Sequence, residues 1–251
     1  MTDAITTTTQ GDVLVVEIDR PPVNALDVET LDALSDTLDK AKPSDPDAIV
    51  LTGKGSLFSA GADLRKALEA EGAEIDAGIV ALARCFETLF LFPRPVVAAV
   101  NGHALAGGVI LTCAADHRVM ADGAGTIGAV ELAAGVPFPA WALEVLRHAV
   151  HRAHFQEIVL FARAYSPADA LRVGMVDEVV PADTLMERSL ERAREMARVP
   201  RTTFALTKHA VKRWAAEAAR KAGAETDEQV KAAWRSPEVK DAIKRLLAAI
   251  G

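Results

Sequence analysis

The sequence predicts one α/β fold in which strands and helices alternate first and helices alone follow. Short β-branched apolar segments are interleaved with segments of helical periodicity through about the first two thirds of the chain. No low-complexity linker divides the 251 residues, a length that suits one large domain or two small ones. We therefore divide the chain into an α/β core, residues 1–195, and a helical C-terminal region, residues 196–251.

The first elements follow from apolar patterning and turn residues. A strand is expected over residues 13–18, a β-branched run that ends just before two prolines. Asp27 can then cap a helix, because leucines recur after it at helical spacing and prolines end the pattern. A second strand follows over residues 47–52, and a loop of small residues leads from it towards another helix.

The middle of the chain contains a long uncharged stretch. A helix over residues 75–92 is expected to precede it, and a strand over residues 116–121 to follow it. Residues 96–115 lack Asp, Glu, Lys and Arg and are long enough to cross a membrane. The asparagine and glycines in the middle of this stretch instead fit a buried strand, a turn and a short apolar helix. Since the N-terminus also has no basic and apolar leader, we expect a cytoplasmic protein with no membrane contact.

Helix signals dominate the last third of the chain. Ser166 and Pro167 form a helix start, with serine as the cap and proline in the first position. Helices are expected over residues 181–198 and 202–223, the second ending at its glycine. Two more are expected to begin near Thr226 and at Ser236.

Composition excludes several classes of protein. The 28 basic residues against 35 acidic ones give a net charge of −7, and aromatic residues make up only 5%. A protein that grips nucleic acid needs clustered cations and usually aromatic stacking platforms, so no nucleic-acid partner is expected. Cys85 and Cys113 are too few for a disulfide framework or a four-thiolate zinc site. We expect both to pack as small reduced apolar residues.

Two motif matches are misleading. Residues 123–128 match GxGxxG, but a glycine and two prolines soon afterwards break the helix that a phosphate site requires. His148, His151 and His154 suggest a metal site, yet the third is rotated well off the helix face of the first. No metal site is expected.

Two turns of small residues are more informative because they occur together. Residues 59–63 and 102–108 each expose backbone with little side chain in the way, and each precedes a helix. The unpaired N–H groups at a helix N-terminus can donate to a developing oxyanion. The alternative is that small residues only allow close packing.

Four blocks of sequence stand in the order and spacing of one known protein family. They are PPVNAL at 21–26, FSAGADL at 58–64, RPVVAAVNGHALAGG at 94–108 with CAADHR at 113–118, and SPADALRVGMVDEVVP at 166–181. Across nearly the whole chain, these blocks resemble the enoyl-CoA hydratase/isomerase (crotonase) superfamily. The resemblance implies a crotonase-like spiral of repeated ββα units with a helical C-terminal trimerisation region, assembled as a homotrimer or hexamer.

The resemblance also implies an acyl-CoA substrate and the residues that hold it. The amides of Ala62 and Gly107 correspond to the two donors to the thioester oxygen. The loop around Ala62 would contact CoA, which enters as part of the substrate, so no separate cofactor is expected. For Asp63, the role of an ordinary helix cap is at least as good an interpretation as a direct contact to CoA. The expected CoA contacts in this loop are Ala60, Ala62, Asp63, Leu64 and Arg65.

The acid–base positions depart from the hydratase pattern. Hydratases of this superfamily use two glutamates to activate water; the first position is Ile110 here, and the second corresponds to Glu131. Apolar neighbours would raise the pKa of Glu131 towards a value useful for proton transfer, although Glu131 could instead be a dipole partner at a helix start. One carboxylate suits an isomerase; a hydratase with altered water activation and a catalytically weak acyl-CoA binder are the alternatives. Phe138 and Trp141 are expected to reshape the acyl pocket.

Overall fold

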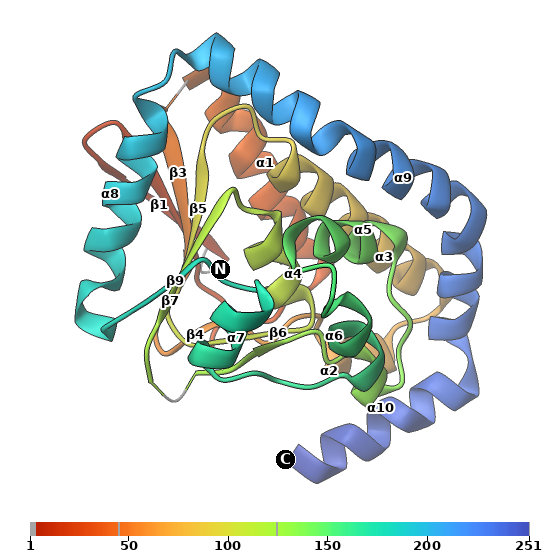
Figure 1. Cartoon of the computed structure of the whole chain (residues 1–251). Coiled ribbons are helices and arrows are strands. Elements are labelled where there is room, and N and C mark those ends of the chain that lie inside the picture. Colours follow the sequence, from red (N-terminus) through yellow and green to blue (C-terminus); the bar gives the residue numbers. More distant parts are fainter. Residues whose placement is uncertain (1–3, 45, 124, 251) are drawn as a thin grey trace.

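The computed structural model describes residues 4–44, 46–123 and 125–250, and within them two sheets (Figure 1). The large sheet has the strand order β1-β2-β3-β5-β7-β9, with β1 antiparallel to β2 and the other neighbours parallel. The small sheet has the order β4-β6-β8 and is parallel throughout. The strands are β1 (Ile5–Gln10), β2 (Val13–Ile18), β3 (Ala48–Gly53), β4 (Leu57–Ser59), β5 (Val96–Val100), β6 (His103–Leu105), β7 (His117–Ala121), β8 (Ile127–Gly128) and β9 (Glu178–Val180).

Helices cover both faces of the large sheet and form the C-terminal region (Figure 1). They are α1 (Val28–Ser44), α2 (Leu64–Glu69), α3 (Gly72–Phe90), α4 (Gly107–Ala114), α5 (Ala140–Ala149), α6 (Phe155–Phe161), α7 (Pro167–Val173), α8 (Leu185–Ala197), α9 (Arg201–Arg235) and α10 (Pro237–Ile250), with the 3₁₀ helices η1 (Glu131–Ala134) and η2 (Ala182–Thr184).

The large sheet separates two hydrophobic cores. Successive side chains of a strand point to opposite faces, so Ile49 and Leu51 of β3 join the core that includes α1 and α3. Ala48 and Val50 of the same strand join a smaller core with the apolar residues of α8. The continuous apolar run of β3 is therefore explained by burial on both faces.

The described residues contain the ββα unit three times. Each of β3, β5 and β7 lies in the large sheet and continues into β4, β6 or β8 of the small sheet, and a helical segment follows. The crossings are tight: a Cβ on Gly53 would lie 2.2 Å from the Leu57 carbonyl oxygen, and one on Gly102 would lie 1.9 Å from that of Ser56. Only glycine fits at these two crossings. The predicted α/β fold of repeated ββα units is confirmed.

The expected helix boundary near Thr226 is wrong. Helix α9 runs without a break from Arg201 to Arg235 and includes Gly223. Thr226 donates its hydroxyl to the Ala222 carbonyl one turn earlier, at 2.9 Å, as a residue inside a helix does. Packing of α9 against the core outweighs the cost of about 1 kcal/mol for an interior glycine. The start at Ser236 is confirmed, since its hydroxyl accepts the Val239 N–H.

The long uncharged stretch has the expected strand-turn-helix structure. It forms β5, β6 and α4, with β6 adding a short strand of the small sheet inside the turn. No helix in the described ranges is both long and apolar enough to cross a membrane.

Candidate active site

Three segments of the predicted site follow the three strands of the small sheet. Ala62 comes shortly after β4, Gly107 after β6 and Glu131 after β8. The strands are parallel, with Ser59 paired to Ala104 in one ladder. Because the carboxyl ends of parallel strands meet at one edge of a sheet, the fold brings these segments together.

The amides of Ala62 and Gly107 are neighbours. A Cβ placed on Gly107 would lie 3.8 Å from the Ala62 nitrogen. Gly107 is the first residue of α4, where the N–H has no partner inside the helix. Neither amide donates a hydrogen bond to any residue that the structure describes. The edge of the small sheet thus presents two adjacent, unused N–H donors.

The turn before Gly107 has an unusual backbone. Ala106 has φ 48° and ψ −122°, a region that costs an L-residue free energy. Its N–H donates to the Gly128 carbonyl at 2.9 Å, which ties the turn to the end of β8. Gly61, with φ 85°, faces it; a Cβ there would come within 2.7 Å of the Ala106 Cβ. Close approach of these two loops therefore requires glycine at position 61.

Glu131 is a buried carboxyl with little to stabilise its charge. It begins η1, so it does stand at a helix start, but that helix is a single turn. The residue is 8% exposed, and its Oε2 accepts no hydrogen bond from any described residue. Burial raises the pKa of Glu131 to about 8. The side chain is therefore mostly protonated at neutral pH and titrates close to it.

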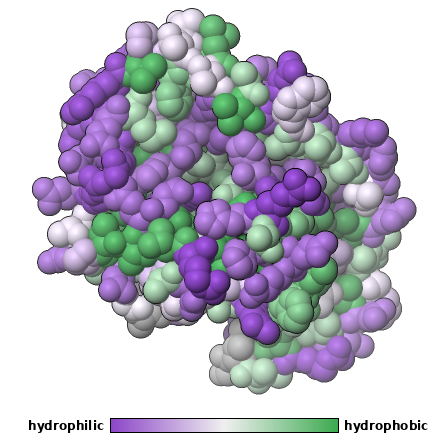
Figure 2. Space-filling view, viewed as in Figure 1, coloured by the Kyte–Doolittle hydropathy of each residue, from purple (hydrophilic) through white to green (hydrophobic). Residues whose placement is uncertain are grey.

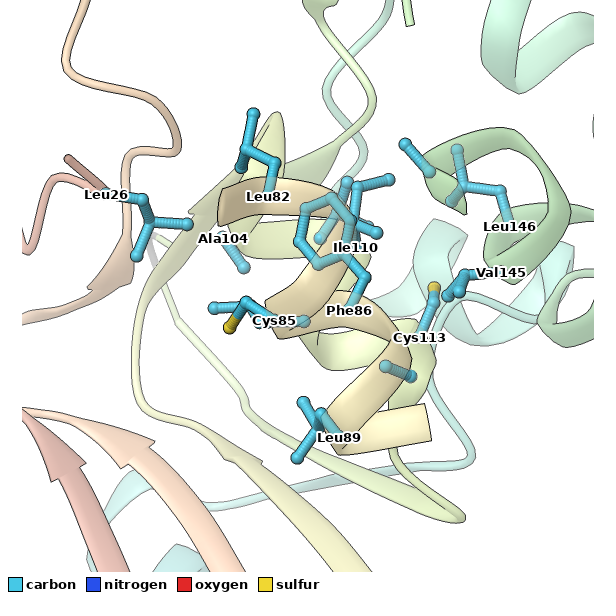
Figure 3. Packing of buried hydrophobic residues seen from close by; sticks show 14 of the residues in the cluster. Leu26, Leu82, Cys85, Phe86, Leu89, Ala104, Ile110, Cys113, Val145 and Leu146 are labelled. Atoms are coloured by element: carbon cyan, nitrogen blue, oxygen red, sulfur yellow. The ribbon is translucent and has the colours of Figure 1, made fainter. Parts of the chain in front are cut away.

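Ile110 gives α4 an apolar side chain in place of a carboxylate. It lies in the first turns of α4, is fully buried, and belongs to the core together with Leu82 and Phe86 of α3 (Figure 3). An apolar side chain therefore occupies the position where the resemblance expects the first glutamate of a hydratase.

The loop expected to contact CoA has a clear local structure. Asp63 caps α2, since its carboxylate accepts the Lys66 N–H at 3.0 Å, so the helix-cap reading is confirmed. Ala60 donates its N–H to the Val23 carbonyl. Leu64 is half-buried against the core, whereas Arg65 is exposed.

Phe138 and Trp141 lie in the main core. Both are buried, and Trp141 packs edge-on against Phe90 with ring centroids 6.2 Å apart. Sequence reasoning missed Trp234 of α9, whose indole N–H donates to the Pro137 carbonyl at 3.2 Å in the loop after Glu131. No local signal marks this residue, because the contact joins segments almost one hundred residues apart.

A cavity of about 650 Å³ opens beside Ala62. Its walls come from the N-terminus of α1, from α2, from one face of α3 and from Trp234. At its rim, the Asp27 carboxylate contacts Arg20 and Lys66, each at 2.5 Å. Burial would raise the pKa of Asp27, but the hydrogen bond from Lys66 and those from Thr30 outweigh it and lower the pKa to about 2.

The cysteines and the three spaced histidines have separate environments. Cys85 and Cys113 are buried free thiols, as expected, and burial raises the pKa of Cys85 to about 12. His148 packs on Phe90, His151 bonds the Arg172 carbonyl, and His154 contacts Glu157. Among the residues with described positions, no three His, Cys, Asp or Glu side chains are grouped as metal ligands.

Comparisons with known proteins agree with this architecture. Residues 8–246 match the model of the enoyl-CoA hydratase/isomerase family. A carnitinyl-CoA dehydratase of Salmonella heidelberg is 34% identical over 199 residues, which is 78% of this chain and 75% of that protein.

Solved structures show the same relationship. A probable enoyl-CoA hydratase from Mycobacterium tuberculosis is 34% identical, with a TM-score of 0.81 over 87% of this chain and 92% of that one. Human mitochondrial delta3-delta2-enoyl-CoA isomerase is 25% identical, with a TM-score of 0.92 over 98% of each chain. The chain therefore belongs to the enoyl-CoA hydratase/isomerase family, as an enzyme that acts on CoA thioesters.

Proposed function

We propose that this enzyme moves the double bond of an enoyl-CoA thioester, with Glu131 as the group that carries the proton. The observation that supports this most directly is which groups the site combines. One buried carboxyl titrates near neutral pH, two unused amides lie at the same sheet edge, and an isoleucine stands where a hydratase has its other glutamate.

The reaction needs one group to remove and return a proton. In its ionised form, Glu131 takes a proton from C2 of a 3-enoyl thioester, and the electrons move onto the thioester oxygen. The amides of Ala62 and Gly107 stabilise that oxyanion; removal of one such donor typically costs about 3 to 4 kcal/mol. The protonated Glu131 then delivers the proton to C4, which forms the 2-enoyl thioester and restores the carboxylate.

The pKa of Glu131 suits a shuttle of this kind. A group that must accept a proton and then give it up works best when its pKa is close to the working pH. With a pKa of about 8 in the free enzyme, both forms of Glu131 are populated around neutrality. Burial among apolar side chains, with no hydrogen-bond partner for Oε2 in the described part of the chain, supports direct transfer to substrate carbon.

A lyase is the second candidate, and the 34% identity to a carnitinyl-CoA dehydratase favours it. Adding or removing water normally requires a second group to orient the water molecule. Ile110 can neither accept nor donate a hydrogen bond, and it is fully buried. We therefore place isomerisation ahead of hydration, and a catalytically weak acyl-CoA binder third.

The exposed side of α9 supports self-association. Leu206, Val211 and Trp214 are 67%, 59% and 66% exposed, which is unusual for large apolar side chains on one helix. We propose that this face joins subunits in a homotrimer or hexamer.

Light scattering after size exclusion tests the assembly. The wild type is expected to have three or six times the chain mass, and Trp214→Glu is expected to have a lower mass. A monomeric wild type would contradict the proposal.

Glu131→Gln tests the proton transfer directly. We expect kcat/KM for conversion of 3-enoyl-CoA to 2-enoyl-CoA to fall by about 10²- to 10⁴-fold, the usual contribution of general acid–base catalysis. Binding of the 2-enoyl product, measured by calorimetry, should persist. Glu144→Gln is the matched control, since Glu144 lies on α5 and pairs with Arg147 at the surface. The mechanism is wrong if Glu131→Gln leaves turnover of every enoyl-CoA unchanged.

A further inference from the structure

The cavity beside Ala62 extends from the loop before α2 along one face of α3. Leu26 and Ala62 line its inner part, and the Leu26 Cδ1 lies 3.0 Å from the position of a Cβ on Gly107. The cavity therefore reaches Ala62, and Leu26 joins it to Gly107. At about 650 Å³ it falls in the size range of pockets that enclose drug-sized ligands. A four-carbon acyl group would leave most of this space unfilled.

One face of α3 forms the long wall. Ile75, Gly78, Ile79 and Leu82 all line the cavity and follow the i, i+3, i+4, i+7 spacing of a single helix face. Ile75, Ile79 and Leu82 are buried. These four residues form an apolar stripe in which Gly78 alone has no side chain.

Gly78 leaves open space in the middle of this wall. Apart from its chain neighbours and the backbone of its own helix, no atom of the described residues lies within 4 Å of the position that its Cβ would occupy. Its backbone is ordinary helix, so no positive φ requires glycine here. Glycine also weakens a helix interior, and neither close packing nor backbone conformation accounts for it.

An anchored aromatic residue forms part of the cavity wall. Trp234 lines the cavity and is 7% exposed. Its indole N–H donates to the Pro137 carbonyl at 3.2 Å. The next residue, Arg235, pairs with Asp76 of α3 at 2.8 Å. These contacts hold the ring against the N-terminal part of the α3 wall.

We propose, resting on the proposed function, that this cavity takes an uncharged acyl chain of medium length, and that Gly78 and Trp234 set how long that chain is. From Ile75 to Leu82 the wall is about 10 Å long at the rise of an α-helix, which matches an extended chain of about eight carbons. Glu29, Glu69 and Glu74 also line the cavity, and their carboxylates would repel an acyl group that ends in its own carboxylate.

Binding of saturated acyl-CoAs tests this without any turnover. We expect the wild type to bind decanoyl-CoA at least about tenfold more tightly than hexanoyl-CoA, because four additional methylenes leave water. Gly78→Leu places a side chain halfway along the wall. It should remove that preference while changing the hexanoyl-CoA affinity by less than about twofold, since shorter chains stop before the obstruction.

Two variants accompany this test. Ala73→Leu is the control, because it adds the same bulk at an exposed position of α3 outside the cavity; it should keep the wild-type preference. Gly78→Ala should reduce the preference by a smaller factor, and its helix-compatible side chain serves if Gly78→Leu does not fold.

The possible results separate the two proposals. Equal wild-type affinity for hexanoyl-CoA and decanoyl-CoA, or an unchanged preference in both Gly78 variants, would overturn the assignment of chain length. Loss of the decanoyl preference in the Gly78 variants supports it, whether or not the enzyme isomerises enoyl-CoA. A wild type that binds by chain length but isomerises no 3-enoyl-CoA would overturn the proposed function alone.

Discussion

Asp116 and Glu131 are two buried carboxyls of this protein that differ in the partners around them. Asp116 lies just before β7, with its side chain 9% exposed, and its oxygens contact Lys208 Nζ at 2.5 Å and Lys212 Nζ at 2.7 Å. It also accepts the Val96 N–H at 2.9 Å. Glu131 is similarly buried, yet its Oε2 has no partner among the described residues. The fold therefore places two ammonium groups and a backbone N–H beside Asp116, whereas Glu131 Oε2 has no hydrogen-bond partner among the described residues.

The difference appears in their proton affinities. Burial alone would raise the pKa of Asp116, but the two ammonium groups outweigh it and hold the pKa below its ordinary value. For Glu131, burial outweighs a backbone hydrogen bond that lowers the pKa, and it raises the pKa to about 8. Burial therefore does not decide by itself whether an acid is structural or reactive; the partners do.

Removing the paired acid should have the largest effect on stability. Asp116→Ala leaves two buried lysine ammonium groups without their carboxylate, and we expect a loss of about 3 to 5 kcal/mol in the free energy of unfolding. Urea denaturation at pH 7 measures this. Asp241→Ala is the control, because Asp241 pairs with Lys244 at the surface and should change stability by less than about 1 kcal/mol. Equal effects in the two variants would show that the Asp116 cluster is not stabilising.

Neutralising the unpaired acid should change how stability depends on pH. The folded protein holds the Glu131 proton up to a pKa of about 8, whereas the unfolded chain releases it near the ordinary glutamate pKa of 4.5. This raised pKa makes the wild type lose stability as pH rises between these values. Glu131→Gln should therefore gain stability relative to the wild type across that window, by at most about 4 to 5 kcal/mol. Parallel stability curves from pH 4 to pH 9 would contradict the raised pKa.

A third acid, at the surface of the same site, should give the smallest effect. Asp63 caps α2 through the Lys66 N–H, so Asp63→Ala should cost about 1 kcal/mol of stability. Ser166→Ala, at the cap of α7, is the matched control and should cost a similar amount. Turnover by Asp63→Ala should change less than twofold. A tenfold rise in KM for acyl-CoA without loss of stability would instead make Asp63 a direct substrate contact.

Buried strands were predictable because burial on both faces leaves a continuous apolar run. The expected strands at residues 13–18 and 47–52 match β2 and β3 closely. The sequence pattern missed β1, whose threonines are mostly exposed and whose place depends on backbone pairing with β2. It also missed β4, β6 and β8, which have two or three residues each and no pattern of their own.

The candidate site was predictable as a set of segments and not as an arrangement. Resemblance located Ala62, Gly107 and Glu131, and apolar neighbours indicated a raised pKa for Glu131. The α3 wall and Trp234 were missed, because a cavity is bounded by elements far apart in the chain. Local propensity predicts a helix end at Gly223, because propensity carries no information about the core that α9 packs against.

The amino-acid sequence by itself determined the ββα rhythm, the two small-residue turns and the replacement of a carboxylate by Ile110, since each depends on residue type at a local position. The tertiary structure alone decided that Asp116 acquires two lysines from α9 while Glu131 Oε2 acquires no partner among the described residues, and that Gly78 faces a cavity. Charge compensation and cavity shape depend on which segments far apart in the sequence come into contact, and these contacts follow from packing of the whole chain.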